Sequence, residues 1–289
     1  MMAASPPTRG SNRLRVVHLY PDLLNVYGDA GNVRTIVVRA ERRGIEVELS
    51  AVHAGSPGVP PADVLLIGGG QDREQLTVAR ELERLGPAIR ERIAEGASLL
   101  AVCGGYQNLG WSYLTSAGAT IAGPGILDIR TEAGDKRLVG SVVAGLTELP
   151  NGTPARSTMI GFENHAGRTY LGPTARPLAT VEIGGGNNGA DGTEGILGLP
   201  GDDGLLGLRI GTYLHGPLLP RNPHIADALI ASGLGRGGPA VALAPLDDSD
   251  EWRAHDRYAA RSRARKRRDE RFPPWLRRIT DPARSLIGF

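Results

Sequence analysis

Residues 98–107 read Ser-Leu-Leu-Ala-Val-Cys-Gly-Gly-Tyr-Gln and include Cys103, the only cysteine among 289 residues. The apolar run predicts a buried strand that breaks into a glycine turn before a helix. Such a turn holds a nucleophile out of the sheet at the positive end of the helix dipole, which favours a thiolate. A core cysteine is the alternative, since free thiols are often buried. Gly104 and Gly105 favour the nucleophile, because a developing oxyanion needs a close backbone N–H.

A base for this thiol is expected at the end of a neighbouring strand. Residues 208–217, Leu-Arg-Ile-Gly-Thr-Tyr-Leu-His-Gly-Pro, predict a strand that stops near His215, where the following Gly-Pro fixes the chain. We therefore choose His215 as the base. Each of the other five histidines reads as an ordinary hydrogen-bonded side chain: His18, His53, His165, His224 and His255.

Three consecutive glycines end another apolar run. Residues 62–72, Ala-Asp-Val-Leu-Leu-Ile-Gly-Gly-Gly-Gln-Asp, predict a buried parallel strand that runs into Gly68, Gly69 and Gly70. Glycines in this position let backbone N–H groups point into a cleft, which suits an oxyanion hole. A glycine turn by itself is weak support, because glycines often only end an element.

With these three segments and three more, the chain resembles class I (triad-type) glutamine amidotransferases of the cobyric acid synthase branch. Within that branch it resembles the glutaminase subunits of lipid II isoglutaminyl synthases. The resemblance covers about residues 14 to 235. The additional segments are LNVYGDAGN at 24–32, GILD at 125–128 and GFENH at 161–165.

The resemblance implies a reaction and a set of roles. Cys103 attacks the side-chain amide of L-glutamine, His215 moves protons, and water resolves a thioester to glutamate and ammonia. Gly69, Gly70 and Gly104 supply oxyanion donors.

In chains of this kind an arginine before Leu-x-Gly anchors the glutamine carboxylate, and Arg137 occupies that place. Its guanidinium suits a carboxylate, although a solvated loop arginine is the alternative reading. Gln107 is assigned to glutamine binding.

The chain departs from the usual family pattern after the histidine. Many triad amidotransferases have a glutamate two residues beyond it, where this chain has Pro217. A catalytic dyad, or a carboxylate from elsewhere such as Glu163, fits this departure, and the sequence leaves the two open.

Ammonia is normally transferred to an acceptor activated by ATP, and no Gly-x-x-x-x-Gly-Lys-[Ser/Thr] motif occurs in the sequence. ATP and Mg²⁺ are therefore expected in another protein. The resemblance implies a MurT-like Mur ligase subunit in a hetero-oligomer, acting on the D-glutamate α-carboxyl of lipid II. An amidotransferase for cobyric acid or another acceptor is the second reading, and an inactive scaffold is the third.

Composition predicts a cytoplasmic α/β enzyme. Hydrophobic residues make up 40% and charged residues 22%, no apolar run reaches the roughly 20 residues of a membrane span, and the N-terminus lacks a signal-peptide core. One cysteine excludes an internal disulfide framework. The sequence has no His, Cys and carboxylate cluster with metal-ligand spacing, so no metal is expected.

Alternating strands and helices up to Val102 predict a mostly parallel sheet with helices on both faces. Strand-like segments between residues 120 and 214 predict an additional mixed or antiparallel layer. The resemblance implies the flavodoxin-like class I amidotransferase fold. Expected strands are 14–19, 45–52, 64–67, 99–102, 138–143, 157–162, 178–183, 196–199 and 205–209; expected helices are 32–43, 75–95, 106 onward and 223–234, the last ending at Gly235.

The chain divides into a tail (residues 1–13), the amidotransferase domain (14–235) and a basic extension (236–289). Residues 251–289 hold twelve Lys/Arg against five Asp/Glu, whereas the other 250 residues have a net charge of −5. This extension reads as a solvated tail, or as a contact with an acidic partner or membrane surface; no nucleic acid is expected. A helix from Trp252 packing back through Tyr258 is the alternative. The glycine-rich residues 184–192 are expected to be a flexible connection without a catalytic role, with a mobile lid or a partner-facing loop as the alternative.

Overall fold

A computed structural model describes residues 13–25, 28–70, 72–149 and 157–271. Its centre is a six-stranded sheet in which β12, β4, β3, β1 and β2 run parallel and β11 is antiparallel at one edge. In chain order the parallel strands stand as 2-1-3-4-5, which is the flavodoxin-like order, so the predicted fold class is confirmed. The strands are β1 (Arg13–Leu19), β2 (Glu46–Val52), β3 (Val64–Ile67), β4 (Ser98–Val102), β11 (Ile196–Gly198) and β12 (Arg209–Thr212).

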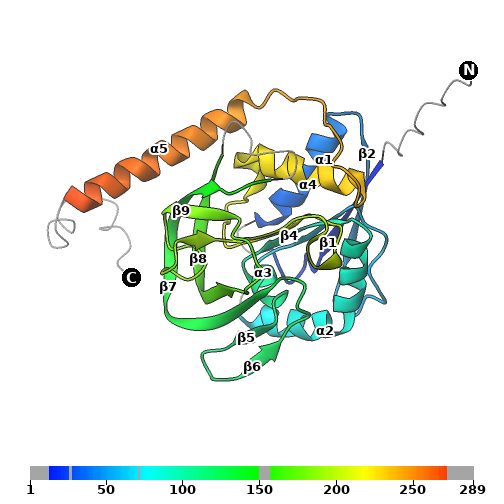
Figure 1. The fold of residues 1–289 in the computed structure, drawn as a ribbon, viewed down its shortest axis with the longest axis horizontal. Coiled ribbons are helices and arrows are strands. Elements are labelled where there is room, and N and C mark those ends of the chain that lie inside the picture. The colour runs from blue at the N-terminus through cyan, green and yellow to red at the C-terminus, as the bar shows by residue number, and fades with distance from the viewer. Residues whose placement is uncertain (1–12, 26–27, 71, 150–156, 272–289) are drawn as a thin grey trace, which may run out of the picture.

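Helices cover both faces of this sheet (Figure 1). The helices α1 (Ala30–Glu41) and α4 (Pro223–Gly235) pack against each other on one face, and α2 (Asp72–Ala94) covers the other. The β3 and β4 strands are therefore buried along their whole length, which explains why their sequences are nearly continuous apolar runs. A parallel sheet covered in this way brings the carboxyl ends of its strands to one edge, where ligands bind in folds of this type.

A second, mixed sheet packs beside the first and supplies one wall of that edge. Its strands are β5 (Ser112–Leu114), β6 (Thr120–Ala122), β7 (Ile129–Leu146), β9 (Ala179–Ile183) and β10 (Thr193–Glu194), with β8 (Thr158–Leu171) paired antiparallel to β7. An isolated antiparallel bridge joins Phe162 of β8 to His215. This bridge connects the two sheets at the end of β12.

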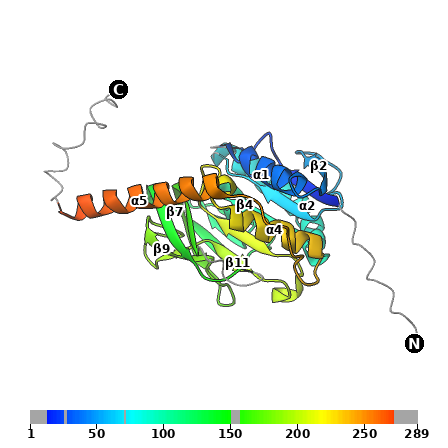
Figure 2. The ribbon, with the colours of Figure 1, turned by 90° about the horizontal axis from the view of Figure 1, so that it is seen from above.

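The basic extension begins as a docked helix. The α5 helix (Ser249–Arg271) runs along β7, β8 and β9 and then projects past the body (Figures 1 and 2). The ring of Trp252 stacks on His224 with centroids 5.1 Å apart, and the Tyr258 hydroxyl donates to the Gly161 carbonyl at 2.6 Å. Its first half therefore packs back onto the domain. The apolar residues near the C-terminus, Trp275 to Phe289, lie outside the described residues.

A charged cluster holds the segment that leads into α5. Arg39 of α1 is only 4% exposed and pairs with Asp227 of α4 at 2.7 Å and with Asp248 at 2.6 Å. Both contacts are bidentate, which suits the planar guanidinium. The extension is thereby tied to the helical layer of the domain.

Most predicted elements are present, although β7 and β8 are longer than expected and β5, β6 and β10 were not expected. Three further differences have a local cause. The helix after Cys103 is the five-residue α3 (Gly104–Asn108), because the chain turns at Gly110 into β5. The strand predicted at 205–209 is β12 at Arg209–Thr212, since a 3₁₀ turn at Asp202–Gly204 precedes it. The α4 helix includes Gly235, and the left-handed cap falls on Arg236, whose side chain pairs with Asp63. Among the described residues no helix has the length and apolarity to span a membrane.

Candidate active site

Cys103 lies on a strained turn between β4 and α3. Its φ of 48° and ψ of −104° lie outside the conformations that L-residues favour. Two hydrogen bonds hold the turn: the Cys103 amide donates to the Thr212 carbonyl at 2.8 Å, and the Gly105 amide donates to the Gly68 carbonyl at 3.0 Å. A Cβ atom at Gly105 would lie 2.8 Å from that carbonyl oxygen, so the second glycine of the motif is required by a close approach of two chain segments.

His215 follows β12 by three residues. Its backbone forms both hydrogen bonds of the bridge to Phe162, at 3.1 and 2.8 Å, and its side chain is 1% exposed. The adjacent Leu214 packs against Gly161, where a Cβ would lie 2.7 Å from Leu214 Cβ. The imidazole is therefore positioned by backbone pairing to the second sheet.

The structure brings Cys103 and His215 together at Gly69. A Cβ built on Gly69 would lie 2.8 Å from His215 Cε1 and 3.1 Å from Cys103 Cβ. The three residues follow β3, β4 and β12, which are adjacent parallel strands. The edge of the sheet that their carboxyl ends form is therefore where the predicted nucleophile and base meet.

Asp29 is the carboxylate that faces His215. It is the N-cap of α1 and is 2% exposed. Its Oδ2 accepts a hydrogen bond from the Gly69 amide at 2.7 Å, and its Oδ1 lies 3.6 Å from His215 Nδ1. Pro217 packs on Gly31 in the first turn of the same helix. The carboxylate thus comes from α1 rather than from the second residue after the histidine.

Burial acts to lower the pKa of His215, but the interactions with Asp29 and Cys103 outweigh burial and raise the pKa to about 10. The imidazole is therefore cationic at neutral pH in this arrangement. A cationic imidazole beside a thiol stabilises the thiolate, which is the reactive form of cysteine. The geometry and the charges match a Cys-His-Asp arrangement for nucleophilic catalysis on an acyl group.

Residues 15–223 match the family model of the CobB/CobQ-like glutamine amidotransferase domain. This match covers most of the chain. The chain belongs to this amidotransferase family. It is 36% identical over 245 residues to the lipid II isoglutaminyl synthase subunit GatD of Staphylococcus aureus, covering 84% of this chain and 93% of that protein.

The chain is also 33% identical over 224 residues to the GatD subunit of Streptococcus pneumoniae, covering 77% of this chain and 81% of that protein. The cobyric acid synthase of Sphingopyxis alaskensis is 31% identical over 211 residues, which are 70% of this chain and 39% of that enzyme.

The amidotransferase differs from the sequence expectation at one of the three glycine donors. The Gly69 amide donates to Asp29 and is therefore committed to positioning that carboxylate. Gly70 and Gly104 are the other two candidate oxyanion donors. Gly104 directly follows Cys103 and begins α3, where the first amides of a helix have no intrahelical acceptor.

The two predicted glutamine-binding side chains have different environments. Arg137 of β7 is exposed and donates to Asn164, with Nε 2.8 Å from the side-chain oxygen and Nη2 2.8 Å from the main-chain oxygen. Gln107 is buried and donates from Nε2 to the Tyr213 hydroxyl at 3.0 Å. Arg137 is thus accessible to a ligand, whereas Gln107 supports Tyr213 from within.

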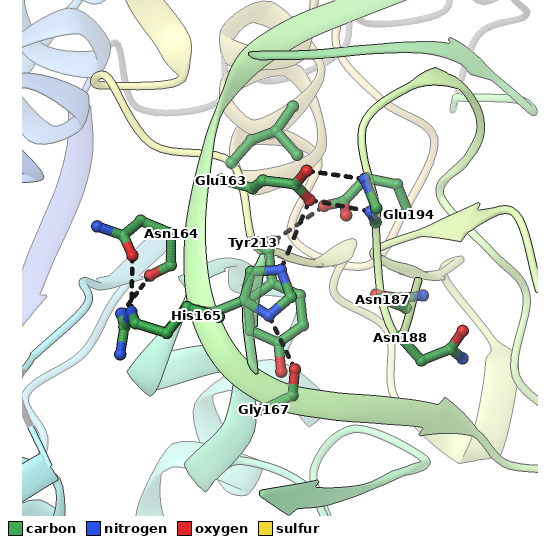
Figure 3. A network of polar contacts seen from close by, with 12 residues as sticks. Glu163, Asn164, His165, Gly167, Asn187, Asn188, Glu194 and Tyr213 are labelled. Atoms are coloured by element: carbon green, nitrogen blue, oxygen red, sulfur yellow. Dashed lines mark hydrogen bonds and ion pairs between the residues drawn. The ribbon is translucent and has the colours of Figure 1, made fainter. Parts of the chain in front are cut away.

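Glu163, which sequence considerations offered as an orienting carboxylate for His215, points elsewhere (Figure 3). It accepts the amides of Gly185 and Gly186 at 2.7 and 3.0 Å and lies 3.6 Å from His165 Nε2. His165 stacks on Tyr213 with centroids 3.5 Å apart. Glu163 therefore organises the glycine-rich loop rather than the base.

The expectation that residues 184–192 form a flexible connection is wrong, because the loop is packed. Asn187 is fully buried, and its side-chain oxygen accepts hydrogen bonds from the Tyr106 hydroxyl at 3.1 Å and from the Gly195 amide at 2.9 Å. Asn188 is 7% exposed and donates to Asp191 at 2.6 Å. Glycines let this loop turn tightly around Glu163, and composition alone does not reveal that the turn is internal.

Glu194 is a further buried carboxyl group, which Figure 3 shows near Glu163. Its Oε1 accepts hydrogen bonds from the Thr212 hydroxyl at 2.6 Å and from the Tyr213 amide at 2.9 Å. Burial raises its pKa to about 7, against the effect of these two bonds. Glu194 therefore holds the end of β12 at Thr212, and Thr212 lies three residues before His215. Within the described ranges, no cluster of three or more His, Cys, Asp or Glu is placed to hold a metal.

Proposed function

We propose that this chain hydrolyses glutamine and supplies the ammonia to a separate, ATP-dependent synthetase that amidates lipid II. The observation that carries the first half is Cys103 on its strained turn, adjacent to a His215 that faces Asp29 at 3.6 Å. Support for the second half is the similarity to two GatD subunits of lipid II isoglutaminyl synthase over most of the length of both chains.

The first chemical step is the attack of the Cys103 thiolate on the side-chain amide carbon of glutamine. The C–S bond forms as the carbonyl oxygen becomes an oxyanion, which the Gly70 and Gly104 amides stabilise. The His215 imidazolium then donates its proton to the leaving nitrogen, so that ammonia departs and a thioester remains. The raised pKa of His215 keeps this proton in place before attack.

The second step regenerates the enzyme. Neutral His215 takes a proton from water as the oxygen attacks the thioester carbon, the C–S bond breaks, and glutamate leaves while the thiolate and the imidazolium reform. Asp29 stabilises the imidazolium in both resting and regenerated states and holds the ring through its Nδ1 side. Arg137 binds the α-carboxylate of glutamine, which does not change during the reaction.

The acceptor is the D-glutamate α-carboxyl of lipid II, activated on a Mur-ligase-like subunit that binds ATP and Mg²⁺. An acceptor in cobalamin synthesis is the second candidate, because a cobyric acid synthase is 31% identical. The chain spans only 39% of that enzyme but 93% and 81% of the two GatD subunits, which favours the peptidoglycan acceptor.

The decisive experiment combines the purified chain with the Mur-ligase-like protein of the same genome, lipid II, glutamine and ATP, and follows amidation by mass spectrometry. We expect amidated lipid II that depends on both proteins. Cys103→Ser should abolish glutamine-dependent amidation, and ammonium chloride should restore it, because the synthetase itself is intact. Glutamine hydrolysis without amidation of lipid II would refute the acceptor, and hydrolysis by Cys103→Ser would refute the nucleophile.

A further inference from the structure

A groove runs between α5 and the body of the protein on the side of β7. Its volume is about 890 Å³, and its lining includes Ser141 of β7, Tyr258 of α5 and five arginines. The arginines are Arg221, Arg257, Arg261, Arg265 and Arg268. No aspartate or glutamate lines it within the part of the chain that the structure describes.

Four of these arginines form one stripe along α5. The spacing of Arg257, Arg261, Arg265 and Arg268 places them on one helix face, over a length of about 16 Å at 1.5 Å per residue. All four are exposed. The fifth, Arg221, lies over the ring of Tyr258 with its guanidinium carbon 5.2 Å from the centroid. The stripe therefore continues onto the domain itself.

The cations on the neighbouring side of α5 have a different role. Arg263 makes a bidentate ion pair with Glu182 of β9, and Lys266 donates to the Glu182 carbonyl at 2.8 Å. These contacts bind the helix to the second sheet. Among the described ion pairs, the one that involves a groove arginine joins Arg265 Nε to Asp269, a residue outside the lining, at 3.9 Å. The groove thus holds positive charge that the fold itself does not neutralise.

The geometry of α5 argues against a flat membrane as the ligand. A surface-seeking helix inserts its apolar face into the lipid, but here His255, Ala259 and Ser262 are buried against the domain. The cationic face is also recessed into a groove. The rest of the sequence, residues 1–250, carries a net charge of −5. This charge would repel a long polyanion such as a nucleic acid duplex. A short acidic chain segment fits both the length and the sign of the site.

We infer that this arginine groove is the docking site for an acidic segment of the synthetase subunit. The inference rests on the proposed function for the identity of the partner. Arginine suits this role because its planar guanidinium binds carboxylates in a bidentate way. The groove also lies next to the catalytic base: Tyr258 donates to the Gly161 carbonyl, and the following residue, Phe162, forms the backbone bridge to His215. A partner docked there lies beside β8, the strand that pairs with His215, and is therefore near the proposed site of ammonia release.

The test measures the dissociation constant between the full chain and the Mur-ligase-like subunit by calorimetry. The variant Arg257→Glu/Arg261→Glu reverses two groove charges. The matched control, Arg253→Glu/Arg267→Glu, makes the same change in net charge at exposed α5 arginines outside the groove. We expect the groove variant to weaken binding by about tenfold or more and the control by less than about threefold. Added salt should weaken wild-type binding more than that of the groove variant.

The remaining outcomes separate this inference from the proposed function. Unchanged melting temperatures and glutaminase rates of the two double variants show that both fold. Equal binding by the groove variant and the wild type overturns the groove and leaves the proposed function standing. Failure of the wild type to bind the subunit, with glutaminase activity intact, overturns this inference and the synthetase half of the proposed function, and leaves glutamine hydrolysis standing. Selective loss of binding to phosphatidylglycerol vesicles or to a short DNA duplex, with subunit binding retained, assigns the groove to that ligand and overturns the inference.

Discussion

Asp29 joins the two parts of the candidate site, because one carboxylate oxygen accepts the Gly69 amide at 2.7 Å and the other lies 3.6 Å from His215 Nδ1. Against the effect of burial, Asp29 and Cys103 together raise the pKa of His215 from 6.5 to about 10 in the folded protein. A raised folded pKa contributes stability that is fully present below pH 6.5 and is lost as the pH rises through about 10. The contact therefore couples stability to the protonation state of the base.

Asp29→Asn should lower the turnover of glutamine by about 10²-fold or more, since it removes the charge that stabilises the imidazolium. The side-chain oxygen of Asn still accepts the Gly69 amide, so we expect the fold to persist. Steady-state glutaminase kinetics check the prediction, with circular dichroism as the control for folding.

Glu163→Gln is the matched comparison for Asp29→Asn, because Glu163 is the other buried carboxylate offered for this role. It should retain most of the activity, since Glu163 contacts Gly185, Gly186 and His165 instead of His215. A larger loss in Glu163→Gln than in Asp29→Asn would reverse the assignment.

Gly69→Ala should reduce glutaminase activity by about 10²-fold, because the new methyl group would lie 2.8 Å from His215 Cε1 and 3.1 Å from Cys103 Cβ. The change moves the nucleophile and base apart without altering either. Gly58→Ala is the control, since a Cβ there meets no atom within 4 Å. Equal rates for the two alanine variants would show that the site tolerates the displacement.

Arg137→Ala should raise KM for glutamine with little change in kcat, because its proposed partner is a carboxylate that is unchanged in the reaction. Arg137→Lys retains the charge but not the bidentate geometry, so its KM for glutamine should lie between those of the wild type and Arg137→Ala. A lower kcat at saturating glutamine with an unaltered KM would contradict this role.

Glu194→Gln should stabilise the protein at alkaline pH. The pKa of Glu194 is raised from 4.5 to about 7 in the fold, so ionisation of this buried group costs stability as the pH rises from 4.5 through 7. The glutamine variant escapes this cost, and its stability relative to wild type should increase by up to about 3 kcal/mol between pH 4.5 and 8. Urea unfolding at both pH values measures it; a constant difference would show that Glu194 does not titrate in this range.

Truncation after Gly238 should lower the melting temperature by about 5 °C or more while leaving the α/β sheet folded. It removes Asp248 from the buried Arg39 and the contacts of His255 and Tyr258 with β8. Asp248→Asn isolates the ion pair and should show part of the shift. A truncated chain that melts with the wild type would indicate that α5 contributes nothing to the stability of the domain.

Local patterns are sufficient to predict the parallel sheet and to indicate Cys103 and His215, the two candidate residues that the structure brings together at Gly69. Apolar runs followed by glycine turns identify β3 and β4 in the sequence, because buried parallel strands lack the alternation of exposed ones. The Cys-Gly-Gly turn and the Gly-Pro after His215 are short motifs that a local pattern identifies, even though Gly105 and Pro217 also contact the distant Gly68 and Gly31.

The sequence patterns do not identify Asp29, although this residue lies in a segment that carries the family resemblance, in the loop between β1 and α1. The rule that ligands gather at the carboxyl ends of parallel strands would have drawn attention to it. Its role nevertheless depends on the packing of α1 beside the end of β12, which no local pattern expresses. The expectation for the loop at 184–192 fails for a related reason. Glycine content indicates backbone freedom, whereas the contacts of Glu163 and Asn187 show that the loop packs inward.

By itself, the sequence determined the parallel α/β sheet and, through its resemblance to class I amidotransferases, the flavodoxin-like class of fold. It also offered Cys103 and His215 as candidate nucleophile and base, because buried strands and tight turns require particular residue types at short spacing. Tertiary structure alone decided which carboxylate faces His215, which glycine amide is committed to Asp29, and that α5 packs on β8 and leaves its arginines along a groove. These relationships join residues that are distant in the chain. They depend on how the helices and the two sheets pack together, and the chemical character of each residue alone does not specify that packing.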